Sequence, residues 1–580
     1  MRRPILAASC VIGCLAGGPI HAVTNSDAVE AFFTASFEER LRDTPEFATS
    51  IGRHDYDDRW SDLSRGGRAT MHDHLVARLR QIDALPSDGI TDSERLSVRL
   101  LRYITQSDLD SEDLETHLLR VQQLFGLHTR VYLTFDRMPA HSPKDYQNLL
   151  ARLRAVPAYV DQNIDILKES VGRGLTQPKV VVDRVVEQLQ RQAAQTADQS
   201  ALLEPFRHFP STIAPAQQAE LADAARRAYN EQFVPAWTRL RDFMAGPYRT
   251  KERTKIGIDS LADGRAAYAT LIRRLTTTSR TPEEIHELGL REVERIEAQM
   301  AAIARETGFT GDLAAFSAHL QQLPEQHFTS KDEMLVYCRN VAKIIEPNLP
   351  AQFRRMPLLI YGVRAIPEDR EASTASNAQA PTPDGLTPGW FNLNTYQPEK
   401  QVRFDKQALV LHEAVPGHVF QGAVARSIAG LPEFRKYYGN SAYAEGWALY
   451  AESLGGELGV YRDAYSRFGQ LSSERFRAVR LVVDTGIHAF GWSREKAVAY
   501  FKEHAPEETE AEIDRYISWP AQALAYKLGQ LEIRALRTEA EQKLGSRFDV
   551  REFHDALLRD GVLPLDLLHE RVEQYISAAH

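Results

Sequence analysis

The chain has 580 residues, of which 43% are hydrophobic and 26% charged, a composition that is typical of globular proteins and excludes collagen-like and disordered chains. Its length suits one large enzyme-sized unit or roughly two to four packed domains. The net charge of −9 argues against a protein that binds the phosphate backbone, so no nucleic acid partner is expected.

Residues 1–22 have the pattern of an export signal. Two arginines follow Met1, an apolar run extends from residue 4 to about residue 18, and Ala22 ends a pattern suited to cleavage. The run is too short for a membrane-spanning helix. Residues 11–14 also resemble a bacterial lipobox with Cys14 as the lipidated residue. The alternatives are therefore a periplasmic protein and one anchored in the cell envelope by lipid, which would be its only membrane contact; the oligomeric state stays open.

Helical periodicity dominates the first half of the chain. Apolar residues between Tyr146 and Val171 recur at helical spacing and form one continuous stripe. No repeat of fixed period suggests a solenoid. We therefore predict an N-terminal helical lobe over residues 23–250, serving as a scaffold or a cleft wall.

A second section begins at a turn-rich stretch, residues 257–264, and we assign residues 251–580 to a metal-binding catalytic lobe. Residues 356–363 and 390–394 are the strand candidates, and residues 373–389 between them are rich in Ser, Ala, Pro, Thr and Gly, which indicates a loop. The remainder is helical in pattern. The predicted fold is mainly α, with one small antiparallel β-sheet next to the helix described below.

The most informative segment is a helix with an apolar face that carries His412, Glu413 and His418, the residue types of a zincin metal site. Histidines four residues apart lie about 40° apart around a helix, whereas a spacing of six gives about 120°. A break at Pro416 and Gly417 is expected to bring the second imidazole back beside the first. The alternative is a pair of hydrogen-bonded histidines at a helix end, without a metal.

A later helix, residues 441–452, supplies two carboxylates on one face. Glu445 and Glu452 are seven residues apart, which places them within about 20° of each other. A carboxylate flanked by Ala, Trp and Leu is costly to bury unless a cation or a histidine compensates it. We predict Glu445 as the third ligand and Glu452 as a hydrogen-bond acceptor for a ligand imidazole; a solvated helix glutamate is the alternative for Glu452.

Several segments follow one another in a distinctive order, at residues 257–264, 281–286, 391–395, 412–418, 445–450, 484–492, 515–516 and 520–529. Their order resembles that of the bacterial domain-of-unknown-function 885 family. This family is distantly similar to neurolysin, angiotensin-converting enzyme and carboxypeptidase Taq, which are helical zinc peptidases. The resemblance implies a zincin-like architecture with two lobes around a deep cleft, and it covers nearly the whole mature chain.

The resemblance also implies roles for individual residues. His412, His418 and Glu445 would bind one Zn²⁺ per chain, and Glu413 would be the general base that activates water. The physical argument agrees, because zinc with three protein ligands keeps a fourth position open, lowers the pKa of water there toward about 7 and polarises a carbonyl.

Two further groups are candidates for stabilising the oxyanion that forms on that carbonyl, namely His488 and Tyr526. Asp484 lies four residues before His488 on a predicted helix, so it could fix the tautomer of the imidazole. The alternatives are a hydrogen-bonded core histidine and a tyrosine used for packing.

Substrate contacts are expected from two places. Arg515 and Lys527 are possible anchors for a free peptide carboxylate, with structural ion pairs as the alternative. Residues 390–395 are expected to form an exposed strand edge that binds an extended peptide through main-chain hydrogen bonds, with Asn392 and Asn394 among the contacts. The loop at residues 373–389 is either a lid over the cleft or an ordinary surface insertion.

Together these features favour an exported zinc metallopeptidase that hydrolyses short peptides, as an exopeptidase of the carboxypeptidase or dipeptidase type. Two alternatives remain open: a non-catalytic periplasmic metal-binding protein, and a metal-dependent hydrolase of a non-peptide amide or ester. Glu413 discriminates between the first alternative and an enzyme, because a storage site needs no base beside the metal.

Overall fold

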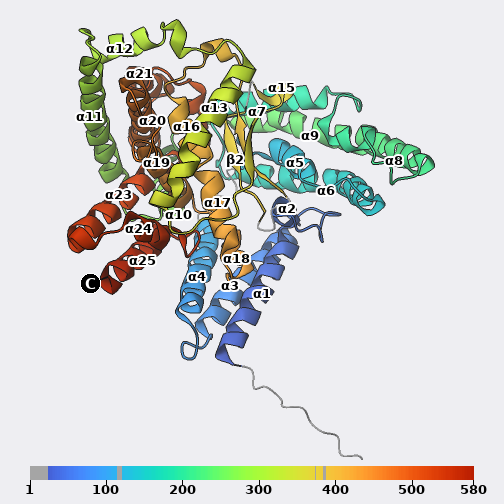
Figure 1. Ribbon diagram of the computed structural model, residues 1–580. Coiled ribbons are helices and arrows are strands. Elements are labelled where there is room, and N and C mark those ends of the chain that lie inside the picture. The colour runs from blue at the N-terminus through green and yellow to red at the C-terminus, as the bar shows by residue number, and fades with distance from the viewer. Residues whose placement is uncertain (1–23, 114–119, 372–373, 383–386, 580) are drawn as a thin grey trace, which may run out of the picture.

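The computed structural model describes residues 24–113, 120–371, 374–382 and 387–579 (Figure 1). The predicted export signal, including Cys14, lies outside the described residues. The fold is 69% helical with one small sheet, which confirms the predicted mainly-α class. Among the described helices, none is both long and apolar enough to cross a membrane.

The first half of the chain is helical, as its periodicity predicts. Capping boxes at Thr24 and Ser142 fix the starts of α1 and α6, where the side chain accepts from the backbone N–H three residues later. Figure 1 shows α6, α8 and α9 extending together to one side of the molecule. The helices are α1 (Asn25–Asp43), α2 (Pro45–Ser50), α3 (Arg65–Asp83), α4 (Asp92–Asp113), α5 (Leu127–Asp136), α6 (Pro143–Gly172), α7 (Lys179–Ala193), α8 (Pro215–Ala228) and α9 (Val234–Phe243).

The second half is also mainly helical. Helix α11 packs along α20, and α19 packs along α23. The helices are α10 (Gly264–Thr276), α11 (Pro282–Glu306), α12 (Leu313–Leu320), α13 (Lys331–Ile345), α14 (Leu349–Gln352), α15 (Glu368–Glu371), α16 (Lys406–Glu413), α17 (His418–Ser427), α18 (Glu433–Lys436), α19 (Ser441–Ser453), α20 (Ala464–His488), α21 (Arg494–His504), α22 (Ala511–Ser518), α23 (Ala525–Leu544), α24 (Val550–Leu558) and α25 (Leu565–Ala578).

The sheet differs from the expected one in two respects. Its strands β1 (Tyr361–Ala365), β2 (Asn377–Gln379) and β3 (Gly389–Leu393) lie in the order β1-β3-β2, with β1 parallel and β2 antiparallel to β3. The sheet is therefore mixed rather than antiparallel. The predicted edge strand, β3, is the central one, because the stretch interpreted as a loop contributes β2. Asn, Ala and Gln have low strand propensity, so the sequence of β2 gave no signal.

Two large buried clusters hold the helices together. One combines Val29 and Leu100 with Val410 and Trp447, and so joins α1 and α4 to α16 and α19. The other combines residues of α6, α7 and α9 with residues of α11 and α20. Both clusters contain residues from before and from after residue 250. The division into lobes at 23–250 and 251–580 stays a prediction.

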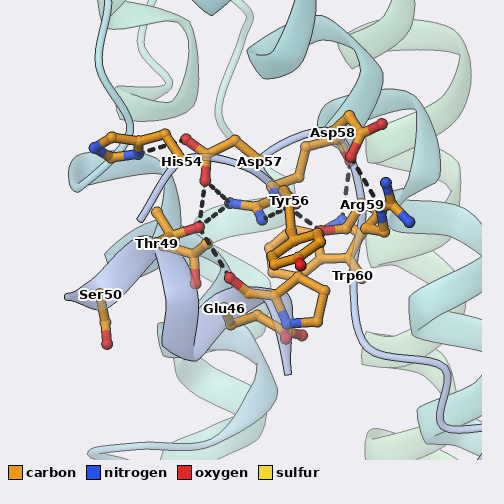
Figure 2. A network of polar contacts seen from close by, with 12 residues as sticks. Glu46, Thr49, Ser50, His54, Tyr56, Asp57, Asp58, Arg59 and Trp60 are labelled. Atoms are coloured by element: carbon orange, nitrogen blue, oxygen red, sulfur yellow. Dashed lines mark hydrogen bonds and ion pairs between the residues drawn. The ribbon is translucent and has the colours of Figure 1, made fainter. Parts of the chain in front are cut away.

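A buried arginine fixes the loop between α2 and α3 onto α6. Arg152 is fully buried, and its guanidinium donates to Thr49 Oγ1 at 2.8 Å and to the carbonyls of Tyr56 and Arg59 at 3.0 Å. Figure 2 shows these loop residues close together, with the carboxylate of Asp57 beside Thr49. Because its donors are satisfied, the buried charge is compensated and the loop is held in place.

The helices that carry the site touch through their backbones. A Cβ atom added to Gly446 of α19 would lie 2.5 Å from the carbonyl carbon of Gly529 of α23. One added to Gly529 would lie 2.0 Å from the carbonyl oxygen of Ala442. Glycine at both positions therefore permits an approach that larger residues would prevent, and it brings Glu445 and Tyr526 to the same cavity.

Candidate metal centre

The chain breaks its helix between the two histidines of the motif. Helix α16 ends at Glu413 and α17 begins at His418, and the intervening turn contains a cis peptide bond before Pro416. The imidazole rings of His412 and His418 come together with centroids 4.9 Å apart and planes at 89°. The predicted break is confirmed, and it overcomes the unfavourable spacing of six residues.

Two contacts explain why this turn is stable. A Cβ atom at Gly417 would lie 1.8 Å from the carbonyl oxygen of His412, so only glycine permits the close return of the chain. The indole Nε1 of Trp447 donates to the carbonyl of Pro416 at 2.9 Å. Because Trp447 belongs to α19, the helix that supplies Glu445 also fixes the turn.

Glu445 completes a cluster of three donors. Its Oε2 lies 3.5 Å from Nε2 of His412 and 3.3 Å from Nε2 of His418. One donor atom from each residue lies within 4.8 Å of the others. In a tetrahedral zinc site with bonds of about 2.1 Å, neighbouring donors lie about 3.4 Å apart. Two imidazole nitrogens and a carboxylate oxygen at these separations fit zinc.

Glu452 lies behind the first histidine. It is fully buried, and its Oε1 lies 2.8 Å from Nδ1 of His412. A carboxylate can only accept, so Nδ1 carries a proton, and whenever Nε2 gives up its own proton its lone pair faces Glu445. The structure thus places Glu452 in the expected supporting position and not on the solvated surface.

The charges of the cluster favour a bound cation. Burial by itself would lower the pKa of His412, but hydrogen bonds with Glu445 and Glu452 raise it to about 9. Burial tends to raise the pKa of Glu445, yet the two histidines hold it well below its usual range. These carboxylates around one buried imidazole create a negative site that a proton or a metal ion neutralises.

Glu413 lies at the end of α16 beside the donors. It is 8% exposed and lines the same cavity as His412, His418 and Glu445. Burial raises the pKa of its carboxyl group. A carboxylate in this position can take a proton from water next to a metal ion more readily than a solvated one.

The donors open into a cavity of about 670 Å³. Residues 375–378, which include part of β2, form one side, and α20 and α22 form another. Arg515 and Tyr526 also line the cavity. Nη2 of Arg515 donates to the hydroxyl of Tyr526 at 3.2 Å, and the tyrosine ring lies nearly parallel to that of His412 with centroids 6.3 Å apart. The structure therefore brings both predicted residues to the cavity that contains the candidate metal ligands.

His488 does not lie in this cavity, which corrects its predicted role. It is 1% exposed, its Nδ1 accepts from the backbone N–H of Ile258 at 3.2 Å, and its Nε2 donates to the carbonyl of Tyr516 at 2.9 Å. Burial lowers its pKa to about 3. It is a hydrogen-bonded core histidine with both nitrogens occupied.

Asp484 does not orient His488 either. Its carboxylate accepts from the hydroxyl of Tyr268 at 2.5 Å and from the backbone N–H of Ala521 at 3.0 Å. Burial raises its pKa to about 7. A spacing of four residues puts Asp484 and His488 on the same face of α20, but the hydrogen bonds of each side chain go to other groups.

Lys527 is also absent from the cavity lining. Its side chain is fully buried, with Nζ 2.7 Å from Glu474 Oε1 and 3.0 Å from Glu292 Oε2. An ammonium group in such an internal ion pair has no access to a substrate. The predicted role as a carboxylate anchor is therefore corrected to the structural alternative.

Asn392 and Asn394 support the cavity wall from behind rather than lining it. Asn392 accepts from Nε of Arg364 at 2.7 Å and donates to Asn377 Oδ1 at 2.9 Å. Asn394 donates to the carbonyls of Glu371 and Thr374, each at 2.8 Å. The predicted direct contacts are replaced by hydrogen bonds that hold the segment carrying β2.

Sequence reasoning missed two arginines of α20. Arg477 and Arg480 line the cavity on a helix whose neighbouring residues are almost all buried. Their spacing of three residues places them on one face. Charged residues at helical spacing within an otherwise buried helix were the signal that could have identified them.

Similarity to a known protein family covers most of the chain. The family model described as bacterial protein of unknown function (DUF885) matches residues 45–572. The chain belongs to this family. No curated protein shows detectable similarity to it.

Two solved structures have the same fold as this chain. A candidate lipoprotein from Colwellia psychrerythraea is similar with a TM-score of 0.90 at 24% identity, over 96% of this chain and 100% of that chain. A candidate lipoprotein of unknown function from Shewanella oneidensis is similar with a TM-score of 0.73 at 20% identity, over 93% of this chain and 99% of that chain. At these identities the similarity establishes the fold alone.

Proposed function

We propose that this DUF885 protein is a zinc-dependent peptidase that hydrolyses short peptides. The observation that carries the proposal is the convergence of His412, His418 and Glu445 beside the buried carboxylate of Glu413, in one cavity. Three protein ligands next to a base are the arrangement of a catalytic zinc site, whereas structural zinc sites use four protein ligands.

The residues divide the chemistry between them. A zinc ion held by His412, His418 and Glu445 would supply Lewis acidity for the peptide carbonyl and for water. The carboxylate of Glu413 takes the proton of the attacking water and delivers it to the leaving amine. The hydroxyl of Tyr526, which accepts from Arg515, donates its proton toward the oxyanion.

The cavity supports a peptide substrate. Strand β2 is one of the two edge strands of the described sheet, and residues 375–378 line the cavity. An extended peptide could add to this edge through main-chain hydrogen bonds and present a carbonyl to the donors. A volume of about 670 Å³ suits a few residues rather than a folded protein, which favours exopeptidase action on short peptides.

The cellular location is part of the same proposal. Residues 1–22 have the pattern of an export signal with a lipobox at Cys14, and the two similar structures are described as candidate lipoproteins. We place the protein outside the cytoplasm, either free in the periplasm or attached to the envelope by lipid.

Metal analysis combined with peptide digestion, followed by mass spectrometry, tests the function. We expect one zinc per chain, loss of zinc in His412→Ala, and retained zinc without turnover in Glu413→Gln. Unchanged turnover in Glu413→Gln, or the absence of stoichiometric metal in wild-type protein, would contradict the proposal. Bound zinc without hydrolysis of any peptide or ester would favour a metal-binding protein, and hydrolysis of esters or other amides alone would favour the non-peptide alternative.

A further inference from the structure

The cavity wall formed by α20 and α22 carries more positive charge than negative charge. Arg480 Nη2 lies 2.9 Å from Glu512 Oε2, and Arg515 Nη1 lies 3.5 Å from Glu512 Oε1. Two guanidinium groups thus share one carboxylate. Nη1 of Arg480 is buried without a hydrogen-bond partner among the described residues, so this wall also contains unused donors.

Arg477 is the cavity arginine with the weakest acidic partner. Among the described residues its nearest carboxylate oxygen is Oε1 of Glu452, 4.0 Å from Nη2, and that oxygen already pairs with His412. Nη1 donates to Ser473 Oγ at 2.5 Å, while Nε has no partner in the described part of the chain. A guanidinium group has five N–H donors and forms its strongest contacts with carboxylates, so this one is incompletely used.

The other acidic groups of this wall neutralise only part of its positive charge. Glu508 lines the cavity together with Arg477. Burial, reinforced by the charge of Glu512, raises the pKa of Glu508 to about 7, so at neutral pH its carboxyl group is partly protonated. Glu507 is already paired with Arg475 at 2.9 Å. The surplus charge of the wall is therefore positive.

Arg477 also lies at a useful distance from the metal donors. The separations of 4.0 Å to Glu452 and 2.8 Å from Glu452 to His412 limit the distance between Arg477 Nη2 and His412 Nδ1 to about 7 Å. The candidate metal donor Nε2, which faces Glu445, is the other nitrogen of the same ring. One extended residue spans about 3.5 Å. A carboxylate one or two residues beyond the bond at the metal could therefore reach this guanidinium.

We propose that Arg477 binds a free carboxylate of the substrate, either the C-terminal carboxylate or an acidic side chain next to the cleaved bond. This inference rests on the proposed function and specifies its substrate class. It assigns to Arg477 the anchoring role that Lys527, with its internal ion pairs, cannot perform.

Three peptides of one parent sequence test the inference. The first has a free C-terminus, the second a C-terminal amide, and the third a C-terminal amide with glutamate as its last residue. Their kcat/KM values are measured with wild type, Arg477→Gln and Arg477→Lys, and their Kd values by calorimetry in the Glu413→Gln background. Arg467→Gln is the matched control, because Arg467 lies on the same helix and pairs with Glu306 at the surface.

We expect wild type to prefer a carboxylate-bearing peptide over the plain amide by about 10- to 100-fold, the range of a charge-assisted hydrogen bond. Arg477→Gln should remove the preference, Arg477→Lys should keep part of it, and Arg467→Gln should keep all of it. The first and third peptides distinguish a C-terminal from a side-chain carboxylate.

Equal losses for acid and amide in Arg477→Gln, or a loss of bound zinc, would overturn the inference and indicate that Arg477 only positions Glu452. No preference in wild type would also overturn it. If wild type hydrolyses none of the peptides but binds the acid through Arg477, the proposed peptidase fails and the carboxylate site stands.

Discussion

Nδ1 of His412 lies 2.8 Å from Oε1 of Glu452, a fully buried carboxylate at the far end of the helix that also supplies Glu445. One helix therefore contacts both nitrogens of the same imidazole: Glu452 lies beside Nδ1, and Glu445 lies 3.5 Å from Nε2. The carboxylate behind the ring makes the ring a stronger ligand and fixes its tautomer.

Replacement of Glu452 by glutamine should weaken metal binding. The amide keeps the shape but removes the negative charge, so we expect zinc affinity to fall by about 10- to 100-fold. Competition with a chelating dye measures the affinity. The control is Glu457→Gln, a half-exposed glutamate paired with Arg537. Equal affinities for the two variants would show that the buried carboxylate does not tune the ligand.

Replacement of Gly417 by alanine should disrupt the site directly. The new methyl group would lie 1.8 Å from the carbonyl of His412, so the turn must shift. We expect the free energy of unfolding to fall by about 1 to 3 kcal/mol, the usual cost of overpacking, and bound zinc to decrease. Denaturant titration and metal analysis measure both. Gly439→Ala is the control, because a Cβ there meets no atom within 4 Å. A fully loaded Gly417→Ala protein of normal stability would contradict the expectation.

Replacement of Tyr526 by phenylalanine should slow the chemical step. The change removes a hydroxyl group that lies 3.2 Å from Arg515 and leaves the ring beside His412. Loss of one oxyanion donor costs about 100-fold in kcat, and we expect KM and zinc content to change little. Steady-state kinetics provide the measurement, with the exposed Tyr396→Phe as control. A change confined to KM would assign Tyr526 to substrate binding instead.

Replacement of His488 by glutamine should affect stability rather than catalysis. The imidazole makes two buried hydrogen bonds with backbone groups, and glutamine cannot reproduce both. We expect the free energy of unfolding to fall by about 1 to 3 kcal/mol, with the kcat of the folded protein maintained. Thermal unfolding and kinetics on the same preparation separate the two effects. A drop in kcat at unchanged stability would restore the catalytic role.

The stability that His488 and His554 contribute should decrease as the pH falls below 6.5, whereas Asp484 and Glu508, whose pKa values are raised to about 7, act in the opposite direction. Burial lowers the pKa of both His488 and His554 to about 3, whereas an unfolded histidine has a pKa of about 6.5. Between these values only the unfolded chain binds the two protons. The stabilisation is thus present above pH 6.5 and lost toward pH 3, at about 2.7 kcal/mol per pH unit for two protons.

Urea unfolding of chelator-treated protein between pH 6 and pH 4.5 measures this slope. His554→Gln removes one of the two buried imidazoles, which donates to the carbonyl of Gln352 and contacts the hydroxyl of Tyr450. The slope of the variant should be smaller by one proton. An unchanged slope would mean that His554 is protonated in the folded state.

The sequence was most informative where chemistry and backbone requirements coincide. The spacing of His412 and His418 was unfavourable for a helix, and the glycine and proline between them indicated the break that the structure contains. The pairing of Glu445 and Glu452 followed from helical periodicity, because both residues lie on one helix.

Sequence reasoning was less informative where tertiary contacts choose the partners. Asp484 is four residues from His488, yet Tyr268 and Ala521 take its carboxylate. The position of β3 at the centre of the sheet depends on β2, whose residues have no strand preference. Arg477 reaches the cavity because of how α20 packs, which a one-dimensional pattern does not specify.

The glycine contact between α19 and α23 has a consequence for how this protein can change. Glu445 directly precedes Gly446, and Tyr526 lies one turn before Gly529, so the backbone contact between the two helices sets the gap between the carboxylate of Glu445 and the hydroxyl of Tyr526. Variation among surrounding side chains can reshape the cavity for new substrates while this gap keeps its width. A methyl group at either glycine would force the two helices apart and displace both Glu445 and Tyr526.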